Sequence, residues 1–228
     1  MTEFYQRSDG FKIPLIEKPI CQDCSNPLGG TYIRCFWCNN YRLLEGIIQI
    51  KAFEYYFEES EKPDHVLSKE IRALKFYNRP DLAKILGECL VYAINHQYPE
   101  LKSLNCIVSV PKASKERQYD QSQLLAKEVS QQTGIPYYDA LSVQGEIKTS
   151  YKMNMQERIE QLDGKIATSY LFHQNSVLII DDICTTGATL RECAKVLRHH
   201  EAKEVKGLVL GKKVDNLLLS NAGRKYEE

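Results

Sequence analysis

The stretch Val177–Leu190, VLIIDDICTTGATL, decides the fold of this chain. Four apolar residues lead straight into two aspartates, and threonines, a glycine and an alanine follow shortly after. The apolar run is typical of a buried strand, and the small residues suit a tight turn into a helix. A buried strand that turns at once into a helix is half of a β–α–β unit.

The segments on either side repeat this alternation. Apolar runs predict strands within residues 105–111 (NCIVSVP), 176–180 (SVLII) and 204–213 (EVKGLVLGKK). Helical spacing of apolar residues predicts helices from Asp64, from about Pro80, within 114–134 and over 187–199. Strands that alternate with amphipathic helices indicate an α/β fold, with a mostly parallel sheet flanked by helices. Residues 1–18 show no clear period.

The aspartates and the turn predict two kinds of ligand chemistry. Ligands of parallel α/β sheets bind beyond the carboxyl ends of the strands. The free N–H groups of a helix's first turn suit a phosphate, and Gly187 lets the backbone close around it. Two carboxylates would repel that phosphate, so they suit sugar hydroxyls or a hydrated Mg²⁺. The pattern therefore predicts a site for a phosphorylated ribose; the alternative is an ordinary turn in which Asp182 or a threonine caps the helix.

Two Cys-x-x-Cys pairs lie near the N-terminus: Cys21, Cys24, Cys35 and Cys38. In a reducing compartment such pairs indicate a metal site rather than disulfides. Four thiolates suit a structural, tetrahedral Zn²⁺; the alternative is four unrelated core thiols. The remaining cysteines lie in apolar settings and are predicted to be small core residues: Cys89, Cys106, Cys184 and Cys193.

Composition narrows the classes of partner. The 228 residues include 30 basic and 30 acidic side chains, so no net charge draws the chain to nucleic acid or to an acidic membrane. There is no apolar run long enough to span a bilayer, and the first residues lack the apolar core of a signal peptide. We therefore expect a cytoplasmic protein that does not insert into membranes.

The stretch that opens this section resembles the signature of the type I phosphoribosyltransferases, namely four hydrophobic residues, two acids and a Thr-Thr-Gly-x-Thr loop. The resemblance implies a site for 5-phosphoribosyl-1-pyrophosphate (PRPP) with Mg²⁺. The resemblance implies that Asp181 and Asp182 contact the ribose hydroxyls. It also implies that the 5′-phosphate is bound by the loop of Thr185, Thr186, Gly187, Ala188 and Thr189.

A second loop is implied for the pyrophosphate of PRPP. In the type I enzymes the corresponding strand end binds pyrophosphate through backbone amides and a basic side chain. The candidates here are Val110, Pro111 and Lys112, in IVSVPKAS. The alternative is an ordinary strand end with a solvated lysine.

A zinc ribbon that precedes a PRPP motif resembles the ComF family of competence-associated proteins, over roughly residues 20–212. Leu74, Lys75 and Phe76 resemble that family's Leu-Lys-Tyr core. RQYDQSQLLAKEV resembles its Arg-Gly-Phe-Asn-Gln-Ser segment, with three substitutions, and Gln161 replaces a usual asparagine. The resemblance implies an N-terminal segment and zinc ribbon over 1–45 and a phosphoribosyltransferase-like domain over 46–228.

Two functions follow from this resemblance. The first is transfer or recognition of a phosphoribosyl group, as a possible phosphoribosyltransferase, with a role in DNA uptake and natural competence. The second is a non-catalytic adaptor for DNA uptake that binds single-stranded DNA and competence proteins, because TYIRCFWCNNYR interleaves aromatic residues with Arg34 and Arg42. Those aromatic residues equally suit packing of the ribbon. Arg117, Gln121 and Arg158 either contact pyrophosphate or an acceptor, or lie on solvated or paired surfaces.

Overall fold

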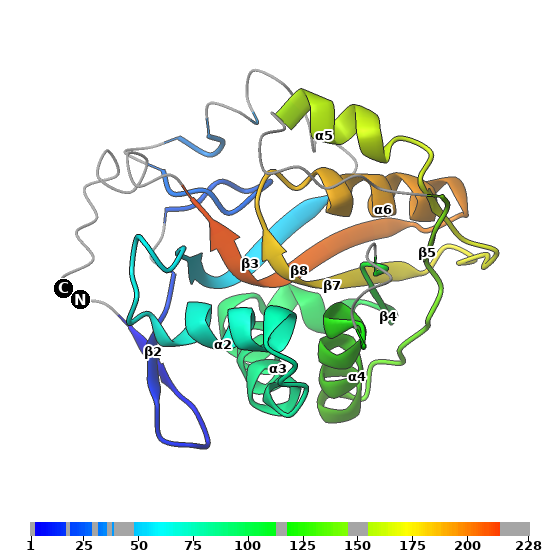
Figure 1. The fold of residues 1–228 in the computed structure, drawn as a ribbon. Helices are drawn as coiled ribbons and strands as arrows, with labels where there is room; N and C mark the ends of the chain where they lie inside the picture. Colours follow the sequence, from blue (N-terminus) through cyan, green and yellow to red (C-terminus); the bar gives the residue numbers. More distant parts are fainter. Residues whose placement is uncertain are drawn as a thin grey trace.

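The centre of the molecule is a parallel sheet (Figure 1). The computed structural model describes residues 3–16, 19–28, 32–35, 38, 48–112, 118–145 and 155–214. Within them the sheet has the strand order β3, β8, β7, β4, and each neighbouring pair is parallel. These strands are β3 (Gln49–Tyr56), β8 (Glu204–Lys213), β7 (Ser176–Cys184) and β4 (Cys106–Ser109). The expected α/β architecture is confirmed, and β3 is an additional edge strand.

Helices cover both faces of the sheet (Figure 1). On one face lie α2 (Val66–Phe76), α3 (Leu82–Tyr92) and α4 (Gln121–Thr133). On the other lies α6 (Ala188–His199), with α5 (Met155–Leu162) packed beyond it. The described chain also contains shorter elements: a π-helical turn (Ala93–Gln97), a 3-10 helix (Pro99–Ser103), and the two-stranded ribbon of β5 (Ser142–Val143) and β6 (Ile166–Ala167).

Strand β7 is longer than the apolar run predicts. It continues through both aspartates to Cys184, because β8 pairs with it up to the match of Cys184 with Lys212. The aspartates therefore lie within the last part of the strand rather than after its end. This placement buries both carboxylates, with Asp181 9% and Asp182 2% exposed.

The helix ends follow the expected chemistry with one exception. Gly134 ends α4 in a left-handed conformation (φ 75°), which glycine adopts without a Cβ clash. Helix α2 begins at Val66, two residues after Asp64, because His65 is its N-cap and its side chain accepts a hydrogen bond from the Ser68 N–H (3.3 Å). Asp64 instead forms an exposed ion pair with Lys69 (3.0 Å).

The cysteine segment packs on the edge of the sheet beside β3. The Ile50 N–H donates to the Asp23 carbonyl (2.9 Å), and the Ser25 hydroxyl donates to the Ile50 carbonyl (2.7 Å). The four paired cysteines belong to the same buried cluster as side chains of α6. The predicted boundary at residue 45 lies outside the described residues and stays a prediction.

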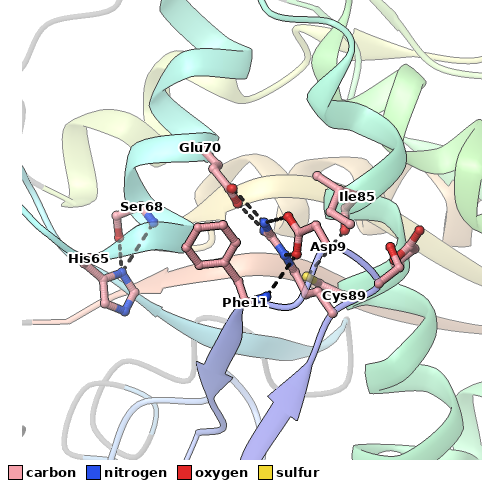
Figure 2. A network of polar contacts seen from close by, with 10 residues as sticks. Asp9, Phe11, His65, Ser68, Glu70, Ile85 and Cys89 are labelled. Atoms are coloured by element: carbon pink, nitrogen blue, oxygen red, sulfur yellow. Dashed lines mark hydrogen bonds and ion pairs between the residues drawn. The ribbon is translucent and has the colours of Figure 1, made fainter.

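An N-terminal hairpin covers the outer side of α2 and α3. It consists of the antiparallel strands β1 (Phe4–Gln6) and β2 (Lys12–Pro14), which are too short to give a readable period. Between them the buried guanidinium of Arg7 donates to Asp9 and to Glu70 on α2 (Figure 2). Tyr5 packs its ring against Tyr92 at 4.3 Å between centroids. The hairpin thus fixes α2 against the rest of the domain.

Within the described ranges, no helix is both long and apolar enough to cross a membrane.

Candidate functional site

A cavity of about 460 Å³ opens at the carboxyl edge of the sheet. Both loops predicted from the sequence line it, although they lie some 70 residues apart in the chain. The predicted residues that line the cavity are Val110, Pro111, Lys112, Asp181, Asp182, Thr185, Thr186, Gly187, Ala188 and Thr189. The fold therefore brings the candidate acids and both candidate loops to one cavity, while their roles remain predictions.

The acidic pair is held by hydrogen bonds from its surroundings. Oδ1 of Asp181 accepts from the Ser122 hydroxyl (2.7 Å) and from the Asp182 N–H (2.9 Å). Burial, together with the charge of Asp182, raises the pKa of Asp181 to about 7. Ser122 comes from the first turn of α4, so that helix orients the acid. The oxygens of two adjacent carboxylates can accept hydrogen bonds from the vicinal hydroxyls of a sugar.

Lys75 brings a positive charge to this pair. Its ammonium lies 2.8 Å from Oδ2 and 3.0 Å from Oδ1 of Asp182. Lys75 belongs to the last turn of α2 and lines the cavity. Its observed partner is Asp182.

The turn after β7 has the shape expected of an anion-binding loop. Gly187 has a φ of 82°, a conformation that side chains with a Cβ rarely adopt, and α6 begins at the next residue. The Thr186 hydroxyl accepts from the Ala188 N–H (3.3 Å). The N–H groups of the first turn of α6 have no partners within the helix, and the positive end of the helix dipole lies at the same place.

Sequence reasoning missed one residue beneath this loop, Lys212. Although Lys212 is only 3% exposed, its ammonium donates to the Thr185 carbonyl and lies 3.5 Å from that of Cys184. Its charge therefore stabilises the backbone of the loop from below. The strand register that places Lys212 beside Cys184 is the only signal for this role, and that register is not legible in the sequence.

The second loop continues from the end of β4. The Val110 N–H donates to the Ile180 carbonyl (3.1 Å), which aligns this strand end with the aspartates of β7. Gln121 also lines the cavity and is 7% exposed, so it does not lie on a solvated helix face. Among the described residues its Oε1 has no hydrogen-bond partner. Arg117 and the side chain of Arg158 lie outside what the structure describes.

The four paired cysteines meet at one buried point. Their Sγ atoms all lie within 4.8 Å of one another. Tetrahedral Zn²⁺ with Zn–S bonds of about 2.3 Å separates its sulfurs by roughly 3.8 Å, so the four thiols fit this ion. The cluster supports the predicted zinc site over four unrelated thiols. The other four cysteines are buried, as expected of core residues.

The aromatic segment near the cysteines is described only in part. Tyr32 and Ile33 are exposed, at 74% and 68%, and Arg34 pairs with Asp23 (2.7 Å). The other members of the segment, Phe36, Trp37, Tyr41 and Arg42, lie outside the described residues. Tyr32 therefore does not pack the ribbon onto the domain.

The family model described as a phosphoribosyl transferase domain matches residues 44–223. The chain belongs to this phosphoribosyl transferase domain family. Membership indicates a phosphoribosyl-related function, in binding or in transfer, and confirms the type I phosphoribosyltransferase fold that the sequence motif implied. No curated protein matches the sequence of the chain.

Solved structures of phosphoribosyl transferase proteins resemble the chain at low identity. A purine phosphoribosyltransferase from Pyrococcus horikoshii Ot3 is 21% identical, with a TM-score of 0.37 and coverage of 56% of this chain and 73% of that one. Glutamine PRPP amidotransferase from B. subtilis is 19% identical, with a TM-score of 0.43 and coverage of 69% of this chain and 43% of that one. The chain therefore spans less than half of that enzyme. Adenine phosphoribosyltransferase from Leishmania tarentolae is 13% identical, with a TM-score of 0.40 and coverage of 77% of this chain and 96% of that one.

Proposed function

We propose that this chain binds PRPP together with Mg²⁺ in the cavity, and that it transfers or recognises the phosphoribosyl group. One observation carries the proposal: the acidic pair and the threonine–glycine loop, which need opposite ligand chemistry, open into the same cavity. A ribose 5-phosphate unit has hydroxyls for the acids and a phosphate for the loop. The family to which the chain belongs supports this choice of ligand.

Each part of the ligand has its own residues in this proposal. Asp181 and Asp182 accept hydrogen bonds from the ribose hydroxyls, and the N–H groups and hydroxyls of Thr185–Thr189 hold the 5′-phosphate. Val110, Pro111 and Lys112 hold the pyrophosphate, and Gln121 lines the same cavity. Mg²⁺, when bound, neutralises charge on the leaving pyrophosphate. In transfer, a nitrogen nucleophile forms a bond to C1 of the ribose as the bond from C1 to pyrophosphate breaks.

Calorimetric titration of PRPP with Mg²⁺ tests the proposal. Wild-type protein should bind PRPP, and Asp181→Asn/Asp182→Asn should lose at least about tenfold in affinity because the ribose hydroxyls lose charged acceptors. Asp163→Asn is the matched control, since the exposed carboxylate of Asp163 pairs with Lys195 on α6 and neither residue lines the cavity. A folded wild type that binds no PRPP would exclude the proposal. Release of pyrophosphate in an acceptor screen then separates transfer from recognition.

We also propose that the chain is a ComF-type protein of the cytoplasm with a role in natural competence. The buried cysteine cluster ahead of the phosphoribosyl transferase domain supports this, as does Lys75 at the cavity. A reducing cytoplasm keeps such thiols free to hold Zn²⁺. In a transformable host, deletion of the gene should lower transformation frequency, and the double asparagine variant should fail to restore it. An unchanged frequency in the deletion strain would contradict this role.

Single-stranded DNA binding, with a role as an adaptor among competence proteins, is the second candidate. The exposed ring of Tyr32 beside the cysteine cluster favours it, because bases stack on exposed aromatic rings. Affinity for a single-stranded oligonucleotide should fall steeply with salt, and Tyr32→Ala should weaken it by at least about fivefold. Tyr170→Ala, at a ring that is 46% exposed elsewhere on the molecule, is the control. Equal binding by both variants and the wild type would remove this candidate.

A further inference from the structure

Asp182 has a resident cationic partner that the PRPP motif itself does not contain. Lys75 lies 107 residues before Asp182 in the chain, and its ammonium contacts both carboxylate oxygens at 3.0 and 2.8 Å. The side chain of Asp182 is 2% exposed and that of Lys75 is 20% exposed. An ion pair this sheltered from water is screened far less than a pair on the surface.

Helix α2 holds Lys75 in this place. Around its first turn the Phe57 N–H donates to the Ser68 hydroxyl (3.0 Å), and further along Arg72 donates to the Phe57 carbonyl (2.9 Å). Glu70 accepts from the buried Arg7 of the hairpin (2.8 Å; Figure 2). At the end of the helix the Tyr119 hydroxyl donates to the Leu74 carbonyl, one residue before Lys75. The ammonium is therefore delivered by an anchored helix.

Two lysines at the end of β8 have other partners. Lys213 pairs with the carboxylate of Glu58, and Lys212 donates to the Thr185 carbonyl. The ammonium of Lys75 contacts Asp182 of the acidic pair. Oδ1 of Asp181 accepts hydrogen bonds from the Ser122 hydroxyl and from the Asp182 N–H. A divalent cation prefers free carboxylate oxygens. Here both oxygens of Asp182 already face a positive charge.

We propose that Lys75 is a positioning residue that acts as the built-in counter-cation of the acidic pair. It holds the Asp182 carboxylate in place for sugar hydroxyls and keeps divalent cations off this carboxylate in the free protein. The positioning for sugar hydroxyls rests on the proposed function, whereas the exclusion of divalent cations by Lys75 does not.

Titration of the zinc-loaded full chain with Mn²⁺ alone, read by electron paramagnetic resonance, tests the exclusion. Wild-type protein should bind Mn²⁺ weakly, and Asp182→Asn should leave that binding unchanged. Lys75→Met should tighten Mn²⁺ binding by at least about tenfold, because one adjacent positive charge is removed. Lys75→Gln should do the same while it keeps a hydrogen-bond donor for Asp182, so a folding defect of the methionine variant does not end the test. Lys75→Arg should behave as wild type.

Two controls and a second readout complete the design. Adding Asp182→Asn to Lys75→Gln should abolish the new Mn²⁺ site, and Lys69→Met, which removes an exposed lysine of the same helix, should create none. Asp182-dependent Mn²⁺ binding by the wild type, or no gain in folded Lys75→Gln, would overturn the inference. PRPP titrations of the same proteins separate the two claims. If the variants gain an Mn²⁺ site but the wild type does not bind PRPP, only the proposed function is excluded. If the wild type binds PRPP but the variants gain no Mn²⁺ site, only the role of Lys75 is excluded.

Discussion

Asp181 lies in strand β7 beneath Ser122 and next to Asp182, and its pKa of about 7 follows from that setting. Burial disfavours the charged form, and the neighbouring carboxylate disfavours it further. Lys75 and the hydrogen bond from Ser122 act in the opposite direction, as the smaller causes. A carboxyl group that titrates near neutrality has a stability cost that depends on pH, because the unfolded chain ionises earlier.

Asp181→Asn should make stability less sensitive to pH. The ordinary pKa of 3.8 applies to the unfolded chain, so wild-type stability should fall as the pH rises from about 4 to 7. The variant lacks this loss and should be more stable than wild type at pH 8, on the order of 1–3 kcal/mol, with no gain near pH 4. Urea unfolding at both pH values measures the difference. Asp163→Asn, at an exposed carboxylate, should show no such gain at pH 8.

His65 should produce a pH dependence of the opposite sign. Burial, with the charges of Lys62 and Arg72, lowers its pKa from 6.5 to about 4. The unfolded chain therefore takes up the proton first, and stability should be lost as the pH falls from 6.5 towards 4. His65→Asn keeps an N-cap acceptor without this titration. The difference in unfolding free energy between His65→Asn and the wild type should shift in favour of the variant by about 1–2 kcal/mol between pH 7 and pH 5. Chemical denaturation at the two pH values measures this shift. An identical difference at the two pH values would contradict the assignment.

At the scale of elements, the close contact between α3 and α4 positions α4, the helix that contains Ser122. A Cβ added to Gly87 of α3 would lie 2.6 Å from the Cβ of Glu128 on α4, closer than two such atoms can pack. The glycine is therefore kept for helix contact rather than for a turn. Because α4 also supplies Gln121 and Ser122 to the cavity, this contact influences the geometry of the acidic pair.

Gly87→Ala should destabilise the protein although alanine favours helix formation. Displacement of α4 should cost about 1–3 kcal/mol, against a gain of about 1 kcal/mol in helix propensity. The net effect should be a loss of up to about 2 kcal/mol in urea unfolding, with weaker PRPP binding as Ser122 shifts. Lys84→Ala, at an exposed position of the same helix, should change neither. A stabilised Gly87→Ala would show that the two helices are farther apart than described.

For the whole molecule, the cysteine cluster joins the N-terminal segment to the sheet. Its four thiols share a buried core with α6, whose first turn forms the candidate phosphate loop. Metal bound at such a site contributes directly to folding free energy, because the unfolded chain holds no preformed site. A bound Zn²⁺ would therefore stabilise the edge of the sheet near β3.

Removal of Zn²⁺ should unfold this part of the molecule first. The purified protein should contain one Zn²⁺ per chain, and a strong chelator should lower the melting temperature by at least about 10 °C. Cys24→Ser should reduce the zinc content, whereas Cys89→Ser, at a buried thiol outside the cluster, should not. Metal analysis and thermal melting give both results. A metal-free protein with an unchanged melting temperature would indicate four core thiols.

The fold followed from the sequence wherever neighbouring residues carry the signal. The strands β4, β7 and β8 and the helices α4 and α6 follow from apolar spacing and from glycines at their ends, such as Gly134. The candidate loop residues follow from a local motif, Asp181 to Thr189. The hairpin around Arg7 was not predicted, because three-residue strands give no period and their stability comes from partners such as Glu70 on another element.

The sequence by itself determined the α/β class, the acidic pair with its threonine loop, and the cysteine pairs, since each depends on residues adjacent in the chain. Only the tertiary structure decided that Lys75 faces Asp182 and that Lys212 lies beneath Thr185. Those contacts depend on how α2 packs and on how β8 aligns with β7. Packing and strand register are set by the summed burial of many side chains, so no local pattern encodes them.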